Sequence, residues 1–305
     1  MTPPVPPIIC FGQQPNGFFP KGFFVDKIFT ARKLQREIGG RIIWFCHDSD
    51  HDYRETITKI KTDRYPEGFV RLNINQPTKH EKLFTPLYQK RIKKGWREET
   101  ANKLQPIIPK ESWELFKSIH TIQHDRHSGQ SEESPTNVGS RTQEIPRQAR
   151  DDNKTVGTVA DFCIAMYRSM KLLEGIEIAR SSDPLFRARA LDISHEDHYI
   201  DIEYKGAIVH ARTSPEGYFI NHGGDVKEFI PSDLVPRMLR KELLSPPRTN
   251  RFAWMQIALH CTHYIYGKGE AEYLDFKAFP EVTFIPREKT RDPELAVINP
   301  STDPG

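Results

Sequence analysis

Two short apolar runs on either side of one helical pattern constrain the fold of this chain more than any other feature. Residues 5–11 (VPPIICF) and 41–45 (RIIWF) are almost continuously apolar, as expected for strands that are buried on both faces of a parallel sheet. Between them, residues 23–40 carry apolar side chains at helical spacing and end in two glycines. The pattern predicts a strand–helix–strand unit with a right-handed crossover, and therefore an α/β protein with a Rossmann-like parallel sheet.

Polar and ionisable residues follow both predicted strands. Residues 12–17 (GQQPNG) come after the first strand, and residues 47–52 (HDSDHD) come after the second. In open parallel sheets, ligands bind in the crevice outside the carboxyl ends of the strands. We therefore expect the two loops to face one crevice.

The cluster over residues 47–52 is rich in groups that do chemistry. Its three aspartates could collect Mg²⁺ through oxygen ligands. His51 lies between Asp50 and Asp52, could act as a general base or hold a phosphate, and is expected to have a pKa above the ordinary 6.5 or so. In the plainer alternative, one of the aspartates caps a following helix, DYRETITKI, with Glu55 in its first turn. No HExxH or Cys/His pairing indicates zinc.

The glycine loop matches neither a Walker A loop nor the dinucleotide pattern GxGxxG. It still leaves backbone N–H groups that could face an anion at the start of the helix, and Gln13 and Gln14 add side-chain donors and acceptors. Lys27 is one turn into the helix, where it could reach either the crevice or solvent. Much later, residues 266–273 (YGKGEAEY) form a second glycine-containing loop in front of Glu270.

The chain divides into four parts by composition. Residues 1–123 are expected to form an N-terminal Rossmann-like half and residues 156–290 a C-terminal half that completes the core. Residues 124–155 contain almost no aliphatic side chain and are expected to be a disordered or low-complexity insertion, and residues 291–305 a flexible tail. Further elements are expected as follows: strands over 69–74 and 282–286, helices over 80–94, 111–121, 156–174 and 231–244, and a hairpin over 199–212 with its turn at Lys205 and Gly206.

Composition narrows the class of protein. Of the 305 residues, 37% are hydrophobic and 28% charged, which is typical of a folded chain, and the formal charge of +3 is too small to indicate nucleic acid. No run of 18 apolar residues predicts a membrane span. The four cysteines show no CxxC spacing and lie among apolar neighbours, so we expect buried, reduced thiols in a cytoplasmic protein.

Taken in order along the chain, these motifs resemble those of the bacillithiol biosynthesis cysteine-adding enzymes. That family has a G-Q-Q-x-x-G-like loop, a helical lysine, a strand ending in W-x-x-x-x-D-H-D-[FY]-x-E, and a late glycine loop. The positions that match are Gly12, Gln13, Gln14, Gly17, Lys27, Trp44, Asp50, His51, Asp52, Tyr53, Glu55, Gly267, Gly269, Glu270 and Tyr273. The similarity is strong over residues 8–60 and moderate over 230–288.

The resemblance implies a Rossmann-like core related to nucleotidylyltransferases, with inserted helical and hairpin segments. It implies a ligase that joins cysteine, or a similar amino acid, to an amino-sugar conjugate through an amide bond, a step in thiol metabolism. Amide formation from a free carboxylate needs activation, for which ATP with Mg²⁺ is the natural supplier. The family forms a homodimer, but this chain ends soon after its last predicted strand without the family's coiled coil. The resemblance therefore does not decide whether this protein forms a homodimer.

On this hypothesis, residues 12–17 and 267–270 frame a small-molecule substrate, with Tyr273 close by. His51 and Lys27 contact phosphate or developing negative charge, and Glu55 orients His51. Asp50 or Asp52 binds Mg²⁺ or the attacking amine. Two alternatives remain: a metal-assisted hydrolase or nucleotidyltransferase that uses Asp50, His51 and Asp52, and an inactive paralogue that acts as a binding module.

Overall fold

The computed structural model describes residues 6–93, 95–125, 157–190, 197–238 and 240–300. Its centre is a five-stranded sheet in which every neighbouring pair of strands is parallel, in the order β12-β11-β1-β2-β5. The strands are β1 (Ile8–Gln13), β2 (Arg41–Cys46), β5 (Ile176–Arg180), β11 (His263–Tyr266) and β12 (Thr283–Pro286). The predicted α/β class and the parallel sheet are confirmed.

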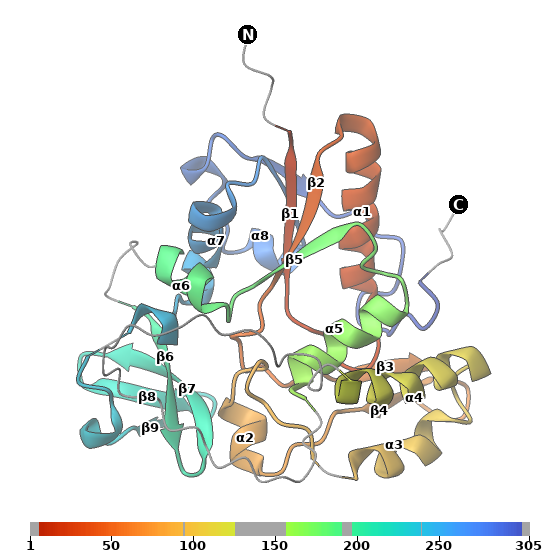
Figure 1. Ribbon diagram of the computed structural model, residues 1–305, viewed down its shortest axis with the longest axis horizontal. Helices are drawn as coiled ribbons and strands as arrows, with labels where there is room; N and C mark the ends of the chain where they lie inside the picture. Colours follow the sequence, from red (N-terminus) through yellow and green to blue (C-terminus); the bar gives the residue numbers. More distant parts are fainter. Residues whose placement is uncertain (1–5, 94, 126–156, 191–196, 239, 301–305) are drawn as a thin grey trace, which may run out of the picture.

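Helices cover both faces of this sheet (Figure 1). Helix α1 (Gly22–Ile38) connects β1 to β2, and α5 (Val159–Ser169) precedes β5. The opposite face carries α6 (Pro184–Ala190) and α7 (Arg251–Leu259).

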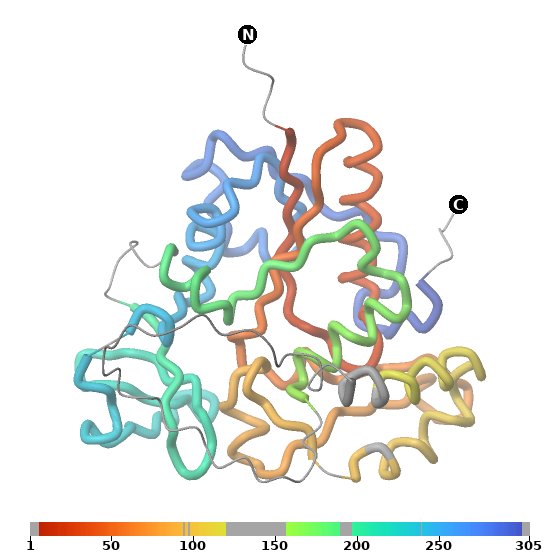
Figure 2. The backbone as a smooth tube through the Cα atoms, in the orientation of Figure 1, coloured from red at the N-terminus to blue at the C-terminus, as the bar shows by residue number. Residues whose placement is uncertain are grey.

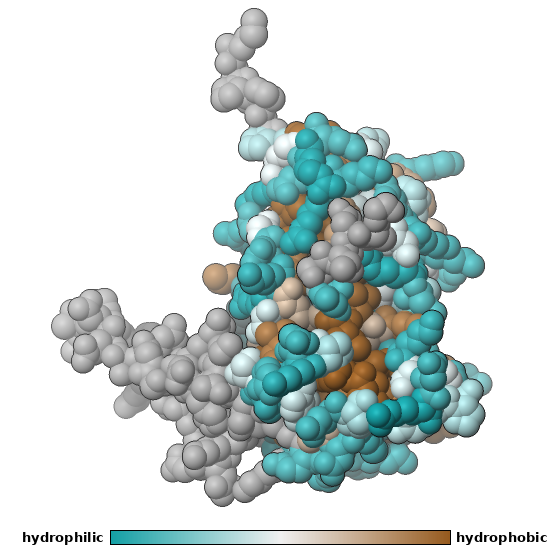
Figure 3. Space-filling model, turned by 90° about the vertical axis from the view of Figure 1, so that its right-hand side faces the viewer, coloured by the Kyte–Doolittle hydropathy of each residue, from teal (hydrophilic) through white to brown (hydrophobic). Residues whose placement is uncertain are grey.

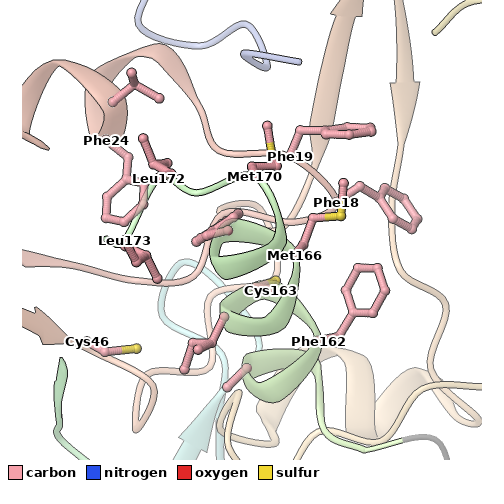
Figure 4. Close-up of a cluster of buried hydrophobic side chains, with 14 of the residues drawn as sticks. Phe18, Phe19, Phe24, Cys46, Phe162, Cys163, Met166, Met170, Leu172 and Leu173 are labelled. Atoms are coloured by element: carbon pink, nitrogen blue, oxygen red, sulfur yellow. The ribbon is translucent and has the colours of Figure 1, made fainter. Parts of the chain in front are cut away.

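Strand β2 shows why its sequence is apolar throughout. Trp44 packs into the apolar cluster formed with α1 and α5, whereas Phe45 packs into the cluster formed with α6 and α7. Successive side chains of a strand point to opposite faces, so a strand covered on both sides needs apolar residues at every position. Figure 4 shows the first cluster, in which Phe24 of α1 and Phe162 of α5 meet apolar side chains from neighbouring loops.

Two further groups of elements lie beyond the carboxyl ends of the central strands, in the lower half of Figure 1. One contains the antiparallel pair β3 (Thr58–Lys61) and β4 (Phe69–Leu72) with helices α2 (Lys79–Phe84), α3 (Trp96–Leu104) and α4 (Lys110–Asp125). The other is an antiparallel sheet in the order β10-β6-β7-β8-β9, which has an apolar core of its own. Its strands are β6 (Tyr199–Tyr204), β7 (Ala207–Ser214), β8 (Gly217–Asn221), β9 (Lys227–Phe229) and β10 (Leu244–Ser245).

Several expected elements are confirmed. The hairpin over 199–212 is formed by β6 and β7, and both residues of its turn have positive φ, 50° at Lys205 and 72° at Gly206. The helices expected over 111–121 and 156–174 correspond to α4 and α5, and the last strand corresponds to β12.

The strand expected over 69–74 is also confirmed, as β4, although it pairs with β3 outside the central sheet, where the third parallel strand along the chain is β5. Other expectations are wrong. Where a helix was expected over 231–244, Ser232–Leu234 and Lys241–Leu243 form short 3₁₀ turns, and the helix expected over 80–94 is only α2. No helix follows Asp52, because residues 53–56 make a turn that leads into β3. The insertion over 124–155 falls almost entirely outside the described residues.

The last described segment packs against the start of α1. Within residues 291–300, which the sequence assigned to a flexible tail, Leu295 accepts a hydrogen bond from Gly22 N–H (2.9 Å) and Ala296 donates one to Lys59 (2.7 Å). Figure 2 shows this segment, at the blue end of the colour scale, beside the red helix. The backbone of residues 291–300 thus belongs to the fold.

No helix in the described part of the chain is both long and apolar enough to cross a membrane. On the side shown in Figure 3, hydrophobic residues gather in the lower half, with hydrophilic residues above and below them. All four cysteines are buried and unpaired, as expected.

Candidate functional site

A cavity of about 730 Å³ opens at the carboxyl ends of β1, β2 and β11. From β1 the chain first adds β2 on one side of the strand and later adds β11 on the other side, so β1 is the switch point of the sheet. Open α/β sheets bind ligands at such a point. One wall belongs to the central sheet, and the other includes Tyr199 and His210 of the antiparallel sheet and His222 of the turn between β8 and β9. The predicted site residues that line the cavity are Gly12, Gln13, Gln14, Lys27, Asp50, His51, Asp52, Glu55, Gly267, Gly269, Glu270 and Tyr273.

An ion pair joins the two glycine loops. The Lys27 ammonium contacts the Glu270 carboxylate and donates a hydrogen bond to the carbonyl of Gly12 (2.7 Å). Glu270 also accepts hydrogen bonds from Gly267 N–H (2.7 Å) and from the Tyr264 hydroxyl (2.9 Å). Burial lowers the pKa of Lys27, and Glu270 partly offsets that effect. Lys27 is therefore engaged within the protein, and its expected contact with phosphate stays a prediction.

Gly12 is required by close packing. A Cβ atom at this position would lie 2.5 Å from Nε2 of His47 and 2.7 Å from the Tyr264 hydroxyl. Gly17, the other glycine of this loop, is buried against Thr56, has a φ of +97°, and is outside the cavity lining. Its conformation lets the chain turn, and the ligand contact expected of it stays a prediction.

The start of α1 has no free N–H groups for an anion in its first turn. Gly22 N–H donates to Leu295 (2.9 Å), Phe23 N–H donates to Pro293 (3.2 Å), and the next two N–H groups both donate to Lys21. The expected anion site at this helix start is therefore wrong, because backbone carbonyl groups already occupy it. The residues present do not fit the phosphates of ATP at this position.

The three aspartates of the cluster have separate partners. Asp48 is fully buried and accepts hydrogen bonds from Arg180, Ser181 and Ser182 at the end of β5. Asp50 pairs with Arg251, and Asp52 pairs with Arg54 (2.7 Å).

Because they are held in these ion pairs, Asp50 and Asp52 do not form a site that fits Mg²⁺. Asp50 also accepts hydrogen bonds from the N–H groups of His51 (2.7 Å) and Asp52 (3.2 Å). Burial alone would raise the pKa of Asp50, but Arg251 and then His51 hold it well below its usual range. Among the described residues, no group of three or more His, Cys, Asp or Glu side chains is arranged to hold a metal ion.

His51 is a neutral imidazole at neutral pH. Burial lowers its pKa to about 4, and the opposing effect of Asp50 is too weak to reverse this shift. The expected rise in its pKa is therefore wrong, because loss of solvent outweighs attraction to the aspartates. Its Nδ1 atom is buried without a hydrogen-bond partner, and its ring centroid is 5.6 Å from that of His210. Lys90 holds the backbone carbonyl of His51 (3.0 Å).

Glu55 does not orient His51. One of its carboxylate oxygens is 3.5 Å from Nδ2 of Asn16, and the same oxygen is 3.9 Å from the Lys21 ammonium. Burial raises the pKa of Glu55, and Lys21 only partly compensates.

The sequence analysis missed a buried pair on the second wall. His210 donates a hydrogen bond from Nδ1 to Asp201 (2.6 Å) and stacks on Tyr199 at 4.5 Å between ring centroids. Tyr88 (2.6 Å) and Arg187 (3.0 Å) both donate to the other oxygen of Asp201. Because the two-residue turn at 205–206 fixes the register of the hairpin, Asp201 and His210 were predictable as opposite neighbours.

Two arginines of the cavity were also missed. Arg251 is at the start of α7, and Arg248 stacks over the ring of Tyr273 at 4.5 Å and donates to the carbonyl of Gly269 (3.4 Å). Nothing in the spacing of residues 248–251 marks them as part of a site, because only the tertiary fold brings them to the cavity.

Comparisons with protein-family models and with curated proteins found no match to this chain. The class that the fold and the cavity define is an α/β protein with a parallel, Rossmann-like sheet and a polar cavity at its switch point.

Proposed function

We propose that the protein is a ligase of the bacillithiol cysteine-adding type, which forms an amide between cysteine, or a similar amino acid, and an amino-sugar conjugate. The observation that carries the proposal is the contact between Lys27 and Glu270, which holds two motifs far apart in sequence at one cavity. The cavity volume of about 730 Å³ is in the range that suits a small molecule.

The charges of the cavity lining suit polar, dipolar substrates. Arg248 and Lys268 line the cavity, and neither forms an ion pair with an acidic side chain of the described residues. These two cations are suited to the negative charge of a carboxyl group that is being activated or attacked. His51, being neutral, takes part as a hydrogen-bond partner and not as a cation.

Activation of the carboxyl group by ATP is part of this proposal, but no protein contact to ATP or Mg²⁺ is assigned. A hydrolase or nucleotidyltransferase that binds metal through Asp50 and Asp52 is disfavoured by their pairs with Arg251 and Arg54. A binding module is the second candidate, because Lys27, Asp50 and Asp52 each have a charged partner within the protein.

The test is amide formation by the purified full chain. The protein is incubated with L-cysteine, glucosaminyl-malate, ATP and Mg²⁺, and mass spectrometry is used to detect a product equal to the sum of both substrates minus one water. Arg248→Gln is expected to lower the rate about tenfold or more, equivalent to about 1.4 kcal/mol. Arg237→Gln is the control, since Arg237 is exposed and outside the cavity lining. Substrate binding without any product would leave the binding module as the function.

A further inference from the structure

The cavity lining presents hydrogen-bond acceptors without donors to match. Glu55 lines the cavity, and its side chain is 34% exposed. An ionised carboxylate has about four acceptor positions, whereas within the described residues Glu55 accepts only one long hydrogen bond, from Asn16 at 3.5 Å. The Lys21 ammonium is 3.9 Å from Glu55 and 3.6 Å from Glu294, and Glu294 also pairs with Lys59 (3.7 Å), so the nearest cation to Glu55 makes only a long contact with it.

A second, separate observation comes from Gln14. This residue lines the cavity and is only 8% exposed, and its Oε1 atom is buried without a hydrogen-bond partner among the described residues. An unsatisfied buried acceptor costs about 1–3 kcal/mol, so such an atom indicates a missing donor. Gln14 is two residues from Asn16, which contacts Glu55, and both Gln14 and Glu55 line the cavity.

We propose that Glu55 and Gln14 form a binding site for the protonated primary amine of a polar ligand, such as an amino sugar. An ammonium group carries three N–H donors and a positive charge, which matches one carboxylate and one amide oxygen. This inference rests on the proposed function and deepens it, because it names the end of the cavity that takes the amine.

The rest of the lining agrees with a dipolar ligand. Arg248 and Lys268 are the lining cations without an acidic partner in the described part of the chain, and Arg248 contacts Gly269 and the ring of Tyr273. A ligand with its ammonium group at Glu55 and an anionic group at Arg248 would satisfy both side chains. A neutral analogue would leave the acceptors of Glu55 and Gln14 unmatched.

The experiment measures binding alone. Glucosamine is titrated into the full chain at about pH 7 and followed by calorimetry, with glucose as the analogue that has a hydroxyl in place of the ammonium. We expect glucosamine to bind at millimolar concentration or below and glucose to bind at least tenfold more weakly. Glu55→Gln should weaken glucosamine binding tenfold or more and Gln14→Met several-fold.

The matched control is Glu272→Gln, which makes the same change of charge at an exposed position outside the cavity lining and should leave binding unchanged. Circular dichroism and the melting temperature verify that each variant folds. Equal binding of glucosamine and glucose, undiminished binding by Glu55→Gln, or no glucosamine binding to the parent would each overturn the inference. If glucosamine binds through Glu55 but no amide is made, only the ligase proposal fails. If Glu55→Gln makes amide as fast as the parent, only the ammonium site is wrong.

Discussion

Burial in the cavity wall governs the protonation of His51. The loss of solvent lowers its pKa to about 4, although Asp50 is adjacent in the chain. The carboxylate of Asp50 is directed mainly to Arg251 and to two backbone N–H groups, so little of its charge remains for the imidazole. Sequence reasoning places the right residues together here but cannot give their pKa values, which depend on burial and on distant arginines.

The pKa of His51 makes a specific prediction about stability and pH. In the unfolded chain this histidine titrates near 6.5, and in the folded protein near 4. Between these values the unfolded state binds more protons, so the free energy of unfolding falls as the pH drops from about 6.5 to about 4. His51→Gln should reduce this dependence in urea unfolding measured across that range. The control is His260→Asn, at an exposed histidine with positive φ, which asparagine tolerates. The same pH dependence in parent and His51→Gln would contradict the assigned pKa.

The ion pair between Lys27 and Glu270 predicts that substitutions at these two positions change the free energy of unfolding in a strongly non-additive way. The two side chains are only 2% and 14% exposed, so removing one partner leaves an uncompensated buried charge. Glu270→Gln should destabilise the protein by about 3–5 kcal/mol in urea unfolding. The double variant Lys27→Met with Glu270→Gln should cost less than the sum of the two single variants, because it removes both charges. Additive losses would show that the two charges are not coupled.

Helix α1 illustrates how an element can be predicted while the contacts at its start cannot. Its apolar spacing and the glycines at 39–40 predict the helix and its end correctly. The residues that satisfy its first N–H groups come from 293–295, more than 250 residues later, and no local signal links the two segments. For the same reason the 3₁₀ turns in 231–244 were predicted as a helix, since composition alone does not show where a chain is held by its neighbours.

Gly22 tests the docking of the C-terminal segment on α1. A Cβ atom at this position would lie 2.0 Å from the backbone oxygen of Asp292, so Gly22→Ala must displace that segment. We expect a loss of about 1–3 kcal/mol, because the segment's backbone hydrogen bonds are disturbed. Gly269→Ala is the control, since its Cβ would meet nothing closer than 3.8 Å. The comparison is made from thermal unfolding curves. Equal melting temperatures for Gly22→Ala and the parent would mean that residues 291–300 are not held at the helix.

At the scale of the whole molecule, the central sheet draws its strands from separate parts of the chain. Strand β5 pairs with β2, and β11 pairs with β1. The first strand–helix–strand unit was predictable because it is local and strongly periodic. The position of β5 and the second wall of the cavity were not, because they depend on pairing across long insertions.

This arrangement predicts the behaviour of a cut chain. A protease recognition site introduced within residues 126–156 and then cleaved should give two fragments that stay together, because the β1–β11 and β2–β5 pairs connect them across the buried core. The fragments should elute as one species in size-exclusion chromatography without denaturant and separate in urea. Separation without denaturant would contradict the sheet order.

The two walls of the cavity belong to bodies with separate apolar cores, one around Trp44 and one around Ile202. A molecule that contacts Glu270 on one wall and His210 on the other would act as a cross-link between these bodies. Its binding would then slow amide hydrogen exchange in β7 as well as in β1, including at residues that it never touches. A ligand confined to one wall would protect one sheet alone, so the pattern of exchange reports how the bound molecule spans the protein.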